Sequence, residues 1–371
     1  PMLLSGMEAA VARIHRAIDD GERIAVFGDY DVDGVTATAL LYTYLDSAGA
    51  DVYYKLPSRD DDGYGLSETA VDLMAAKGVS LIVTVDNGVS ANAAIAHAKE
   101  QGVDVVVTDH HLPPQTLPEA AAIVNPQLPG DESPCKTLSG AGVAFKLAAA
   151  LDGCTPDEML PFYGDLAAIG TIADIMLLEG ENRRIVKAGL ALLQQTERPG
   201  IAALIEACGL GGKELTAENV SFGLAPRLNA AGRMDSAAAA LELLLCEDPE
   251  EAEAIVAGLE AQNAARQKAE QDILQGVLDS VAADETYGAD RILVVWGRGY
   301  HQGVIGIVAS RVVERFGKPA IIVSVDENGE GKGSGRSIAG VSLYNAIAAC
   351  GDLLIRFGGH ALAAGLSVRE E

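Results

Sequence analysis

The chain has 371 residues, of which 49% are hydrophobic, so it is long enough for two or three domains with sizeable cores. Its 27 basic and 53 acidic residues give a formal net charge of −26, which argues against a broad basic surface for nucleic-acid backbone. No apolar run reaches the roughly 18–20 residues of a membrane span, and the N-terminus lacks a signal-peptide pattern. The five cysteines are scattered and odd in number. We therefore expect no disulfide framework or thiolate zinc site, and a cytoplasmic location.

The first half of the chain alternates apolar strand-like runs with helical patterns. Strands that are apolar throughout and separated by helices predict a parallel sheet covered on both faces. From about residue 139 to residue 209 the pattern becomes mainly helical. The predicted strands are residues 23–28, 51–56, 80–86, 104–108 and 121–124, and the predicted helices are residues 35–47, 67–77 and 91–101.

The second half contains a long helical stretch and then a second α/β pattern. A short helix is predicted to end at Cys246, and a long helix from about Pro249 to Asp284 connects two domains. Strand signals return at residues 292–296 and 320–325, on either side of a helix at residues 303–316. The predicted fold is α/β. A parallel-sheet domain (1–235) is joined by connecting helices (236–284) to a smaller α/β domain (285–371), with a cleft between the two domains.

Acidic and imidazole side chains follow several predicted strands of the first domain. Because the carboxyl ends of parallel strands meet at one edge of a sheet, we expect these side chains to converge there. A last aspartate, Asp174, follows a later apolar run. The residues after the strands are Asp29, Asp31, Asp33, Asp86, Asp109, His110 and His111.

Each of these residues has an ordinary structural explanation when taken alone. One aspartate after a strand is usually a helix cap or turn residue, and a pair of histidines is usually structural. The combination favours a different interpretation, because carboxylates and imidazole together suit Mn²⁺ or Mg²⁺. Two such ions would neutralise the crowded carboxylates and could activate water against a phosphodiester. Asp86, at the end of the middle strand, is the candidate to bridge them.

Four of these segments resemble the motifs of the DHH phosphoesterase superfamily. They are GDYDVDG (28–34), VTVDNG (83–88), TDHH (108–111) and GTIAD (170–174), in the order of the superfamily. Further segments resemble a branch of that superfamily, the bacterial single-strand-specific 5′→3′ DNA exonucleases that act in recombination and repair. These are SRDDDGYGLS (58–67), GAGVAFK (140–146), PRLNAAGRM (226–234), HQGVIGIVASR (301–311), GSGRSI (333–338) and FGGHALAAGLS (357–367).

The resemblance implies roles for the clustered residues of the first domain. Asp109 matches a position that orients a histidine, although helix capping explains it equally well. His111 matches the histidine beside the reacting phosphate, and we assign catalytic roles to His111, Asp86 and Asp109. The implied ligands of two Mn²⁺ or Mg²⁺ ions are Asp29, Asp31, Asp33, Asp86, His110 and Asp174.

The second domain resembles the DHH-associated substrate-binding module. Its glycine-rich loops would let backbone approach a phosphate, and Ser334 and Arg336 would bind a terminal 5′-phosphate. The remaining implied contacts are Arg59, Arg233, Gly358, Gly359 and His360. Implied partners are single-stranded DNA with a 5′ end, a single-strand-binding protein and a helicase. Members of the branch generally continue into an oligonucleotide-binding module, and we expect this chain to be a catalytic core that lacks the module.

Two other functions remain open from the sequence. One is a phosphodiesterase acting on small substrates such as short oligonucleotides or cyclic dinucleotides, because superfamily members use the same metal cluster for those reactions. The other is a scaffold without activity, since some relatives have lost metal ligands. Every ligand position is filled here, which argues against the scaffold.

Overall fold

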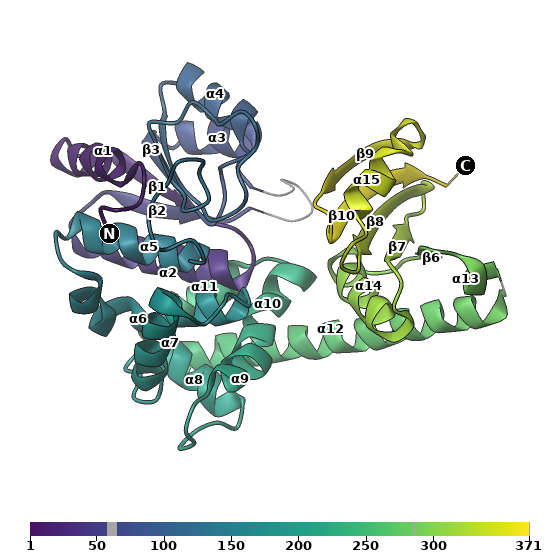
Figure 1. Cartoon of the computed structure of the whole chain (residues 1–371). Helices are drawn as coiled ribbons and strands as arrows, with labels where there is room; N and C mark the ends of the chain where they lie inside the picture. The colour runs from purple at the N-terminus through teal and green to yellow at the C-terminus, as the bar shows by residue number, and fades with distance from the viewer. Residues whose placement is uncertain (58–64, 285, 371) are drawn as a thin grey trace. The chain divides into compact units, whose positions relative to one another are not determined.

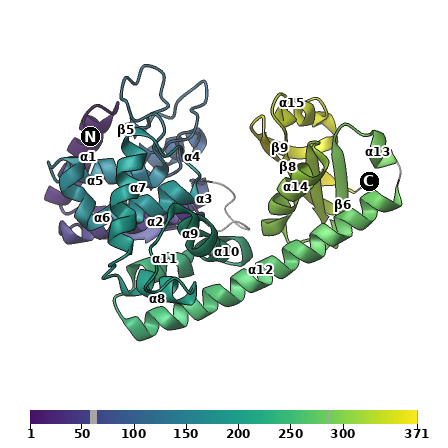
Figure 2. The same ribbon diagram turned by 60° about the horizontal axis from the view of Figure 1, so that its bottom comes forward.

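The computed structural model describes residues 1–57, 65–284 and 286–370. The chain forms two compact units, Pro1–Ala261 and Gln262–Glu371. The division falls within the longest helix, α12 (Pro249–Ala283), which is continuous in Figures 1 and 2. No helix in the described ranges is long and apolar enough to cross a bilayer.

The first unit is built on a parallel sheet in the order β2-β1-β3-β4-β5. Its strands begin and end close to the predicted positions, because each is an apolar run bounded by charged or glycine residues. The topology places β3 in the middle of the sheet, between β1 and β4. The bounds are β1 (Arg23–Phe27), β2 (Val52–Lys55), β3 (Val79–Val85), β4 (Asp104–Thr108) and β5 (Ala122–Val124).

Helices cover both faces of this sheet, as predicted. Along β1, Ile24 and Val26 pack into the core beneath α2 (Val32–Ser47) and α5 (Gly140–Leu151). Ala25 and Phe27 point to the opposite face, into a core under α3 (Glu68–Ala75) and α4 (Asn92–Glu100). Figure 1 shows the two helix layers on either side of the strands. The apolar character of every strand position therefore reflects burial on both faces.

The remaining helices of the first unit extend the core on the side of α2 and α5. The early turns of α12 bury Ala252, Val256 and Leu259 in the same core. Their bounds are α1 (Met7–Asp19), α6 (Pro156–Ala173), α7 (Gly180–Leu193), α8 (Pro199–Ala207), α9 (Ala217–Asn219), a π-turn (Val220–Leu224), α10 (Ala225–Met234) and α11 (Ala238–Leu245).

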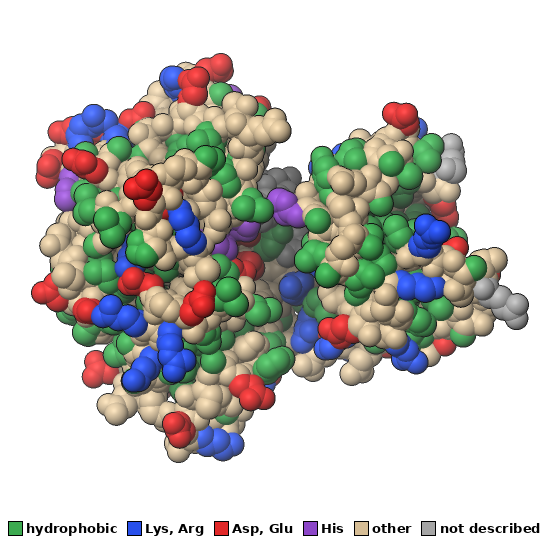
Figure 3. All heavy atoms as spheres, viewed as in Figure 1, with side chains coloured by type: hydrophobic (Ala, Val, Ile, Leu, Met, Phe, Trp, Pro, Cys, Tyr) green, Lys and Arg blue, Asp and Glu red, His purple; other side chains and the backbone are tan. Residues whose placement is uncertain are grey.

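The second unit holds a mixed sheet in the order β6-β7-β8-β10-β9, in which only β6 and β7 are parallel. The helix α14 packs on one face against β7 and β8, and Leu343 and Ile347 of α15 pack on the other. Figure 3 shows hydrophobic side chains gathered on the visible face of this unit. The bounds are α13 (Thr286–Ala289), β6 (Leu293–Arg298), α14 (Gln302–Phe316), β7 (Ala320–Val325), β8 (Glu330–Arg336), α15 (Leu343–Ala348), a 3₁₀ turn (Gly351–Leu353), β9 (Leu354–Gly359) and β10 (Ala363–Arg369).

One predicted feature of the second unit is wrong. The glycine-rich segment containing Ser334 and Arg336 was expected to be a loop, but it is β8, the central strand of the sheet. Its glycines leave room for neighbouring leucines, because a Cβ at Gly333 would lie 2.9 Å from the Leu366 side chain and one at Gly335 would lie 2.5 Å from that of Leu343. Local composition suggested a turn, and the packing of neighbouring strands and α15 overrides it.

Candidate active site

The first group of acidic residues lies between β1 and α2. The sequence predicts this helix from residue 35, but α2 begins at Val32, because the Asp31 carboxylate caps it by accepting the Gly34 N–H at 3.0 Å. Asp33 therefore lies within the first turn of the helix, while Asp29 remains in the preceding turn. The cap and the helix turn fix where these three carboxylates stand.

Asp33 is held by the start of another helix. Its carboxylate accepts the backbone N–H groups of Gly140 (2.6 Å) and Ala141 (2.9 Å) in the first turn of α5. A Cβ at Gly140 would lie 2.4 Å from the Cβ of Asp86, so only glycine lets the helix come this close. The sequence assigns no role to the GAGVAFK segment, and the structure shows that its first residues hold the Asp33 carboxylate.

Asp86 directly follows the middle strand β3. Its φ of 62° lies in the left-handed region, which costs energy for a residue with a side chain. The Asn87 amide stabilises this turn by donating to the carbonyls of Val85 (2.9 Å) and Phe27 (3.3 Å). The strained conformation is thus fixed by its neighbours and directs the Asp86 carboxylate into the cluster.

His110 brings the other carboxylates together. Its Nε2 lies 3.1 Å from Asp86 Oδ1, 3.6 Å from Asp174 Oδ2 and 3.8 Å from Asp33 Oδ2. Asp174 reaches this point from the C-terminal end of α6. Residues from β1, β3, β4 and α6 therefore meet at one edge of the sheet, as the sequence predicted.

Burial and mutual repulsion perturb this cluster. Burial, followed by the charges of Asp33 and Asp31, raises the pKa of Asp86 well above its usual range. The same two effects raise the pKa of Asp174 to about 8. Burial also raises the pKa of Asp33 and lowers that of His110. A bound cation would offset the repulsion and favour the ionised carboxylates.

The donor atoms fit divalent metal ions. They fall into three overlapping groups, and within each group the ligand atoms lie within 4.8 Å of one another. Asp86 and His110 each belong to two of the groups. Oδ1 of Asp86 is buried and, although Nε2 of His110 lies 3.1 Å away, it forms no hydrogen bond within the described ranges, so it is available to a cation. Carboxylates with one or two imidazoles suit Mn²⁺ or Mg²⁺. The groups are Asp86–His110–His111, Asp33–His110–Asp174 and Asp29–Asp31–Asp86.

Asp109 orients the second histidine. Its Oδ1 lies 2.8 Å from Nδ1 of His111, and its Oδ2 accepts the Val89 N–H at 2.9 Å. Burial alone would lower the pKa of His111, but the hydrogen bond and charge of Asp109 outweigh it and raise the pKa to about 9. Asp109 stands in front of no helix, so its contacts fit the orienting role better than capping. At neutral pH the His111 ring is a cation that can donate to an anionic oxygen.

Sequence reasoning missed one residue beside the cluster. Asn229 of α10 accepts the backbone N–H of Val32, between two of the aspartates, at 3.2 Å. A Cβ at Gly232 would lie 2.4 Å from the Tyr30 carbonyl, so α10 packs tightly on this turn. Arg233, an expected substrate contact, follows in the last turn of the same helix. The PRLNAAGRM segment was the available signal, but only Arg233 received a role.

The expected phosphate-binding residues of the second unit also lie near one another. Ser334 and Arg336 point toward α14, since a Cβ at Gly306 would lie 2.9 Å from Ser334 Oγ and 3.1 Å from Arg336 Nη2. Gly365 of β10 pairs with Ser334 on one side and Gly358 on the other. Gly359 adopts a φ of 135°, and His360 donates its backbone N–H to Ala363 across the β9–β10 turn. Arg59 lies outside the described residues.

Comparison with known proteins identifies the family. The model of the DHH family, N-terminal domain, matches residues 23–171, and that of the DHHA1 domain matches residues 289–371. The single-stranded-DNA-specific exonuclease RecJ of Bacillus subtilis is 45% identical over 100% of this chain and 47% of its own length. The RecJ of Escherichia coli is 41% identical over 99% of this chain and 67% of its own length.

A solved structure gives the same result. The crystal structure of an exonuclease RecJ bound to manganese superposes with a TM-score of 0.87 at 41% identity, covering 99% of this chain and 91% of that one. The present chain spans about half of the Bacillus relative and two thirds of the Escherichia relative. With both domain models and these whole-chain matches, the chain belongs to the RecJ group of the DHH phosphoesterase family.

Proposed function

We propose that this chain is the catalytic core of a single-strand-specific 5′→3′ DNA exonuclease. It hydrolyses phosphodiester bonds with two divalent metal ions, Mn²⁺ or Mg²⁺. The observation that carries the proposal is the convergence of six acidic and imidazole ligands at one sheet edge, in a chain so similar to RecJ exonucleases. The complete ligand set argues against an inactive scaffold.

Six residues would hold the two ions, and Asp86, which belongs to two of the donor groups, would be shared by both. When bound, the ions would supply hydroxide from water and stabilise charge on the attacking and leaving oxygens. Asp33, fixed by the start of α5, and Asp86, fixed by its turn, would hold the ions in place. His111, kept cationic by Asp109, donates to a phosphate oxygen or to the leaving oxygen. The residues assigned are Asp29, Asp31, Asp33, Asp86, His110 and Asp174.

The net charge of −26 is compatible with a DNA substrate if binding is local. Metal ions and a few arginines can attract phosphates within a negatively charged protein. Figure 3 shows acidic and basic side chains interspersed over the visible face of the first unit, without an extended basic surface. We infer that Ser334 and Arg336 bind the 5′-phosphate, with Arg59, Arg233, Gly358, Gly359 and His360 as further contacts. We expect a cytoplasmic enzyme of DNA recombination and repair that works with a single-strand-binding protein and a helicase.

The test is a hydrolysis assay with Mn²⁺ on a 5′-phosphorylated single strand labelled at its 3′ end. Parallel reactions contain a blunt duplex, a duplex with a 5′ overhang, a very short oligonucleotide and a cyclic dinucleotide. We expect release of mononucleotides from the single strand and the overhang, and little from the blunt duplex, which is wider and stiffer than a single strand. Equal rates on blunt duplex and single strand would contradict the strand specificity. Turnover of the small substrates alone would favour the small-molecule phosphodiesterase.

The same assay examines recognition of the 5′ end. Arg336→Ala should weaken binding by roughly 1.5–3 kcal/mol, the range for a charged hydrogen bond. It should also remove the preference for a 5′-phosphate over a 5′-hydroxyl. Arg298→Ala is the matched control, because Arg298 lies on β6 and pairs with Glu370. An unchanged preference in the Arg336 variant would refute the assignment.

A further inference from the structure

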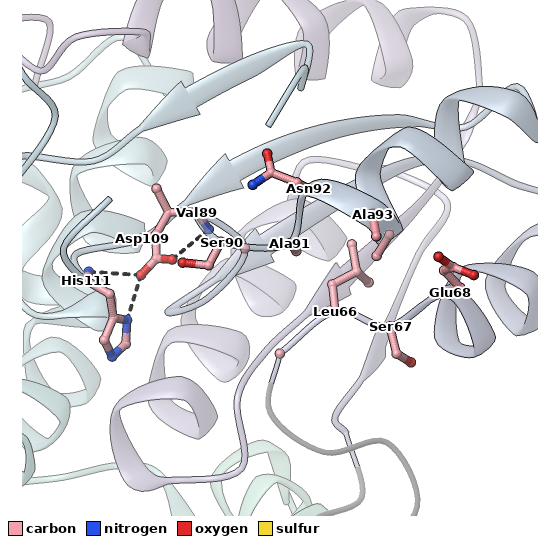
Figure 4. A pocket seen from close by; sticks show the side chains of 13 residues that line it. Leu66, Ser67, Glu68, Val89, Ser90, Ala91, Asn92, Ala93, Asp109 and His111 are labelled. Carbon is pink, nitrogen blue, oxygen red and sulfur yellow. Dashed lines mark hydrogen bonds and ion pairs between the residues drawn. The ribbon is translucent and has the colours of Figure 1, made fainter. Parts of the chain in front are cut away.

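A pocket of about 370 Å³ lies in the first unit directly beside Asp109 and His111. Its walls come from the start of α3, from the turn between β3 and α4 with the first turn of α4, and from the residues after β4. Figure 4 shows Asp109 and His111 on one side of the pocket and Leu66, Ser67 and Glu68 on the other. None of the six assigned metal ligands lines it, so among the described residues it adjoins the cluster only through Asp109 and His111.

The lining suits an uncharged, flat group better than a phosphate. Leu66, Val89 and Ala94 are buried and provide apolar surface. The described lining includes no lysine or arginine, and Glu68 adds a carboxylate that would repel an anion. The volume is at the lower end of the range for small-molecule sites, about 300–1,000 Å³. It therefore fits a single ring system with its substituents.

The polar groups of the lining can satisfy the edge of such a ring. Ser67 Oγ accepts the Ala70 N–H at 3.1 Å and keeps its own proton to donate. Ser90 contributes a second hydroxyl, and Asn92 a side-chain amide. Hydroxyl groups both donate and accept, so they can pair with the edge of any nucleobase. An apolar surface with a few polar groups at its rim is the usual composition of a small-molecule site, and these hydroxyl groups can pair with a base without selecting its identity.

The pocket is tied to the catalytic histidine through Asp109. One carboxylate oxygen of Asp109 bonds the His111 ring and the other accepts the N–H of Val89 in the pocket wall. A group in the pocket therefore lies next to the phosphate that His111 is assigned to contact. We propose that the pocket holds the base of one of the two nucleotides joined by the cleaved bond, an inference that rests on the proposed exonuclease function.

The test fills the pocket from α4. Ala93 is exposed in the first turn of that helix and lines the pocket, so Ala93→Trp should occupy it without disturbing the core. Ala93→Ser is the matched control, because it leaves the pocket open. The substrates are a 5′-phosphorylated strand, and the same strand with an abasic residue at its first or its second position.

We expect the wild type and Ala93→Ser to cleave one of the two abasic strands about tenfold less efficiently than the intact strand, because the abasic residue loses the apolar contacts and hydrogen bonds of one base. Ala93→Trp should cleave the intact strand about tenfold more slowly and that abasic strand at the wild-type rate. The affected position identifies which base is held. The proposal would be overturned if the wild type cleaved both abasic strands at the rate of the intact strand, or if Ala93→Trp slowed cleavage of all strands equally.

A binding measurement separates this proposal from the exonuclease function. A strand carrying the fluorescent base 2-aminopurine at its first or second position is titrated with metal-free protein. The emission should change on binding for one position in the wild type and in Ala93→Ser, and not in Ala93→Trp. If no strand is hydrolysed but this pattern holds, the exonuclease function fails and base binding stands. Identical emission changes for all three proteins would refute the pocket as a base site.

Discussion

Buried aspartates in two regions of the first unit have opposite surroundings. At the sheet edge, Asp86 lies among other carboxylates, and burial and their charges raise its pKa well above its usual range. In the loop between β5 and α5, Asp131 is almost as buried, but its carboxylate accepts four hydrogen bonds. The donors are the Ser5 N–H (2.8 Å), the Ser133 N–H (2.9 Å) and hydroxyl (2.5 Å), and Lys136 Nζ (2.6 Å).

These different surroundings distinguish a carboxylate that stabilises the fold from carboxylates that are arranged to bind a cation. Burial opposes the ionisation of Asp131, but the hydrogen bonds from Lys136 and Ser133 outweigh it and hold its pKa below its usual range. Asp131 is satisfied within the chain and ties the N-terminal residues to this loop. The edge cluster is satisfied only in part by its histidine, so it needs positive charge from outside the chain.

Removing one carboxylate from each region should give the largest contrast in catalysis. Asp86→Ala should lower the rate of strand hydrolysis at least about a thousandfold, because two cations would then face each other without a shared carboxylate. Asp131→Ala should keep the wild-type rate per folded molecule. The measurement is kcat at saturating Mn²⁺ for both variants. A rate for Asp86→Ala near that of the wild type would show that Asp86 does not bridge the ions.

The same two substitutions should have opposite effects on the metal-free fold. Asp131→Ala should lower the free energy of unfolding by about 3 kcal/mol, because it leaves the N–H groups of Ser5 and Ser133 without their acceptor and removes the carboxylate that pairs with Lys136. Asp86→Ala relieves repulsion and should leave the metal-free protein as stable as the wild type or more so. Urea unfolding in the presence of a chelator measures both. Greater loss of stability from Asp86→Ala would contradict this distinction between the two regions.

The stability of the metal-free protein should depend on pH through the edge cluster. The pKa of Asp174 is about 8 in the folded protein and near 3.8 when unfolded, so between these values the folded state binds the extra proton. The free energy of unfolding should therefore fall as the pH rises from about 4 to 8. Asp174→Asn should flatten this dependence. At pH 8, Mn²⁺ at about 100 times its dissociation constant should restore about 2.7 kcal/mol. A stability that rises over this pH range would contradict the raised pKa.

The sequence predicted the edge cluster well because its signals are local. Apolar strands followed by Asp29, Asp86 or Asp109 can be read within a few residues, and parallel topology then brings the strand ends together. The helices on both faces followed from the same alternation of patterns. The DHH motifs added the family, and the six residues expected to bind metal lie in one cluster.

Features that depend on distant packing could not be predicted in this way. The contact of Gly140 with Asp33 and Asp86 joins segments far apart in the chain, and no local pattern reveals it. The β8 segment has a turn-like composition, and only its neighbours make it a strand. The four hydrogen bonds of Asp131 come from the backbone and side chain of Ser133, the side chain of Lys136 and the backbone of Ser5. Ser5 lies over a hundred residues earlier in the chain, so no local pattern predicts its contact with Asp131.

The smallest expected effect concerns Asn229, which acts on the metal ligands through the backbone. Its side chain accepts the N–H of Val32 between Asp31 and Asp33, so Asn229→Ala should loosen that turn without removing a ligand. Groups that orient metal ligands typically contribute 10–100-fold to affinity or activity, and we expect about a tenfold increase in the Mn²⁺ concentration for half-maximal activity. At saturating Mn²⁺, kcat should return close to the wild-type value, which a purely structural role would not produce. Asn219→Ala is the matched control, because its side chain accepts the Thr216 N–H at 3.0 Å in a similar way, at the start of α9. If both variants shift the Mn²⁺ dependence equally, or neither does, then Asn229 does not position the metal ligands, and the turn between β1 and α2 is held by its own aspartate cap.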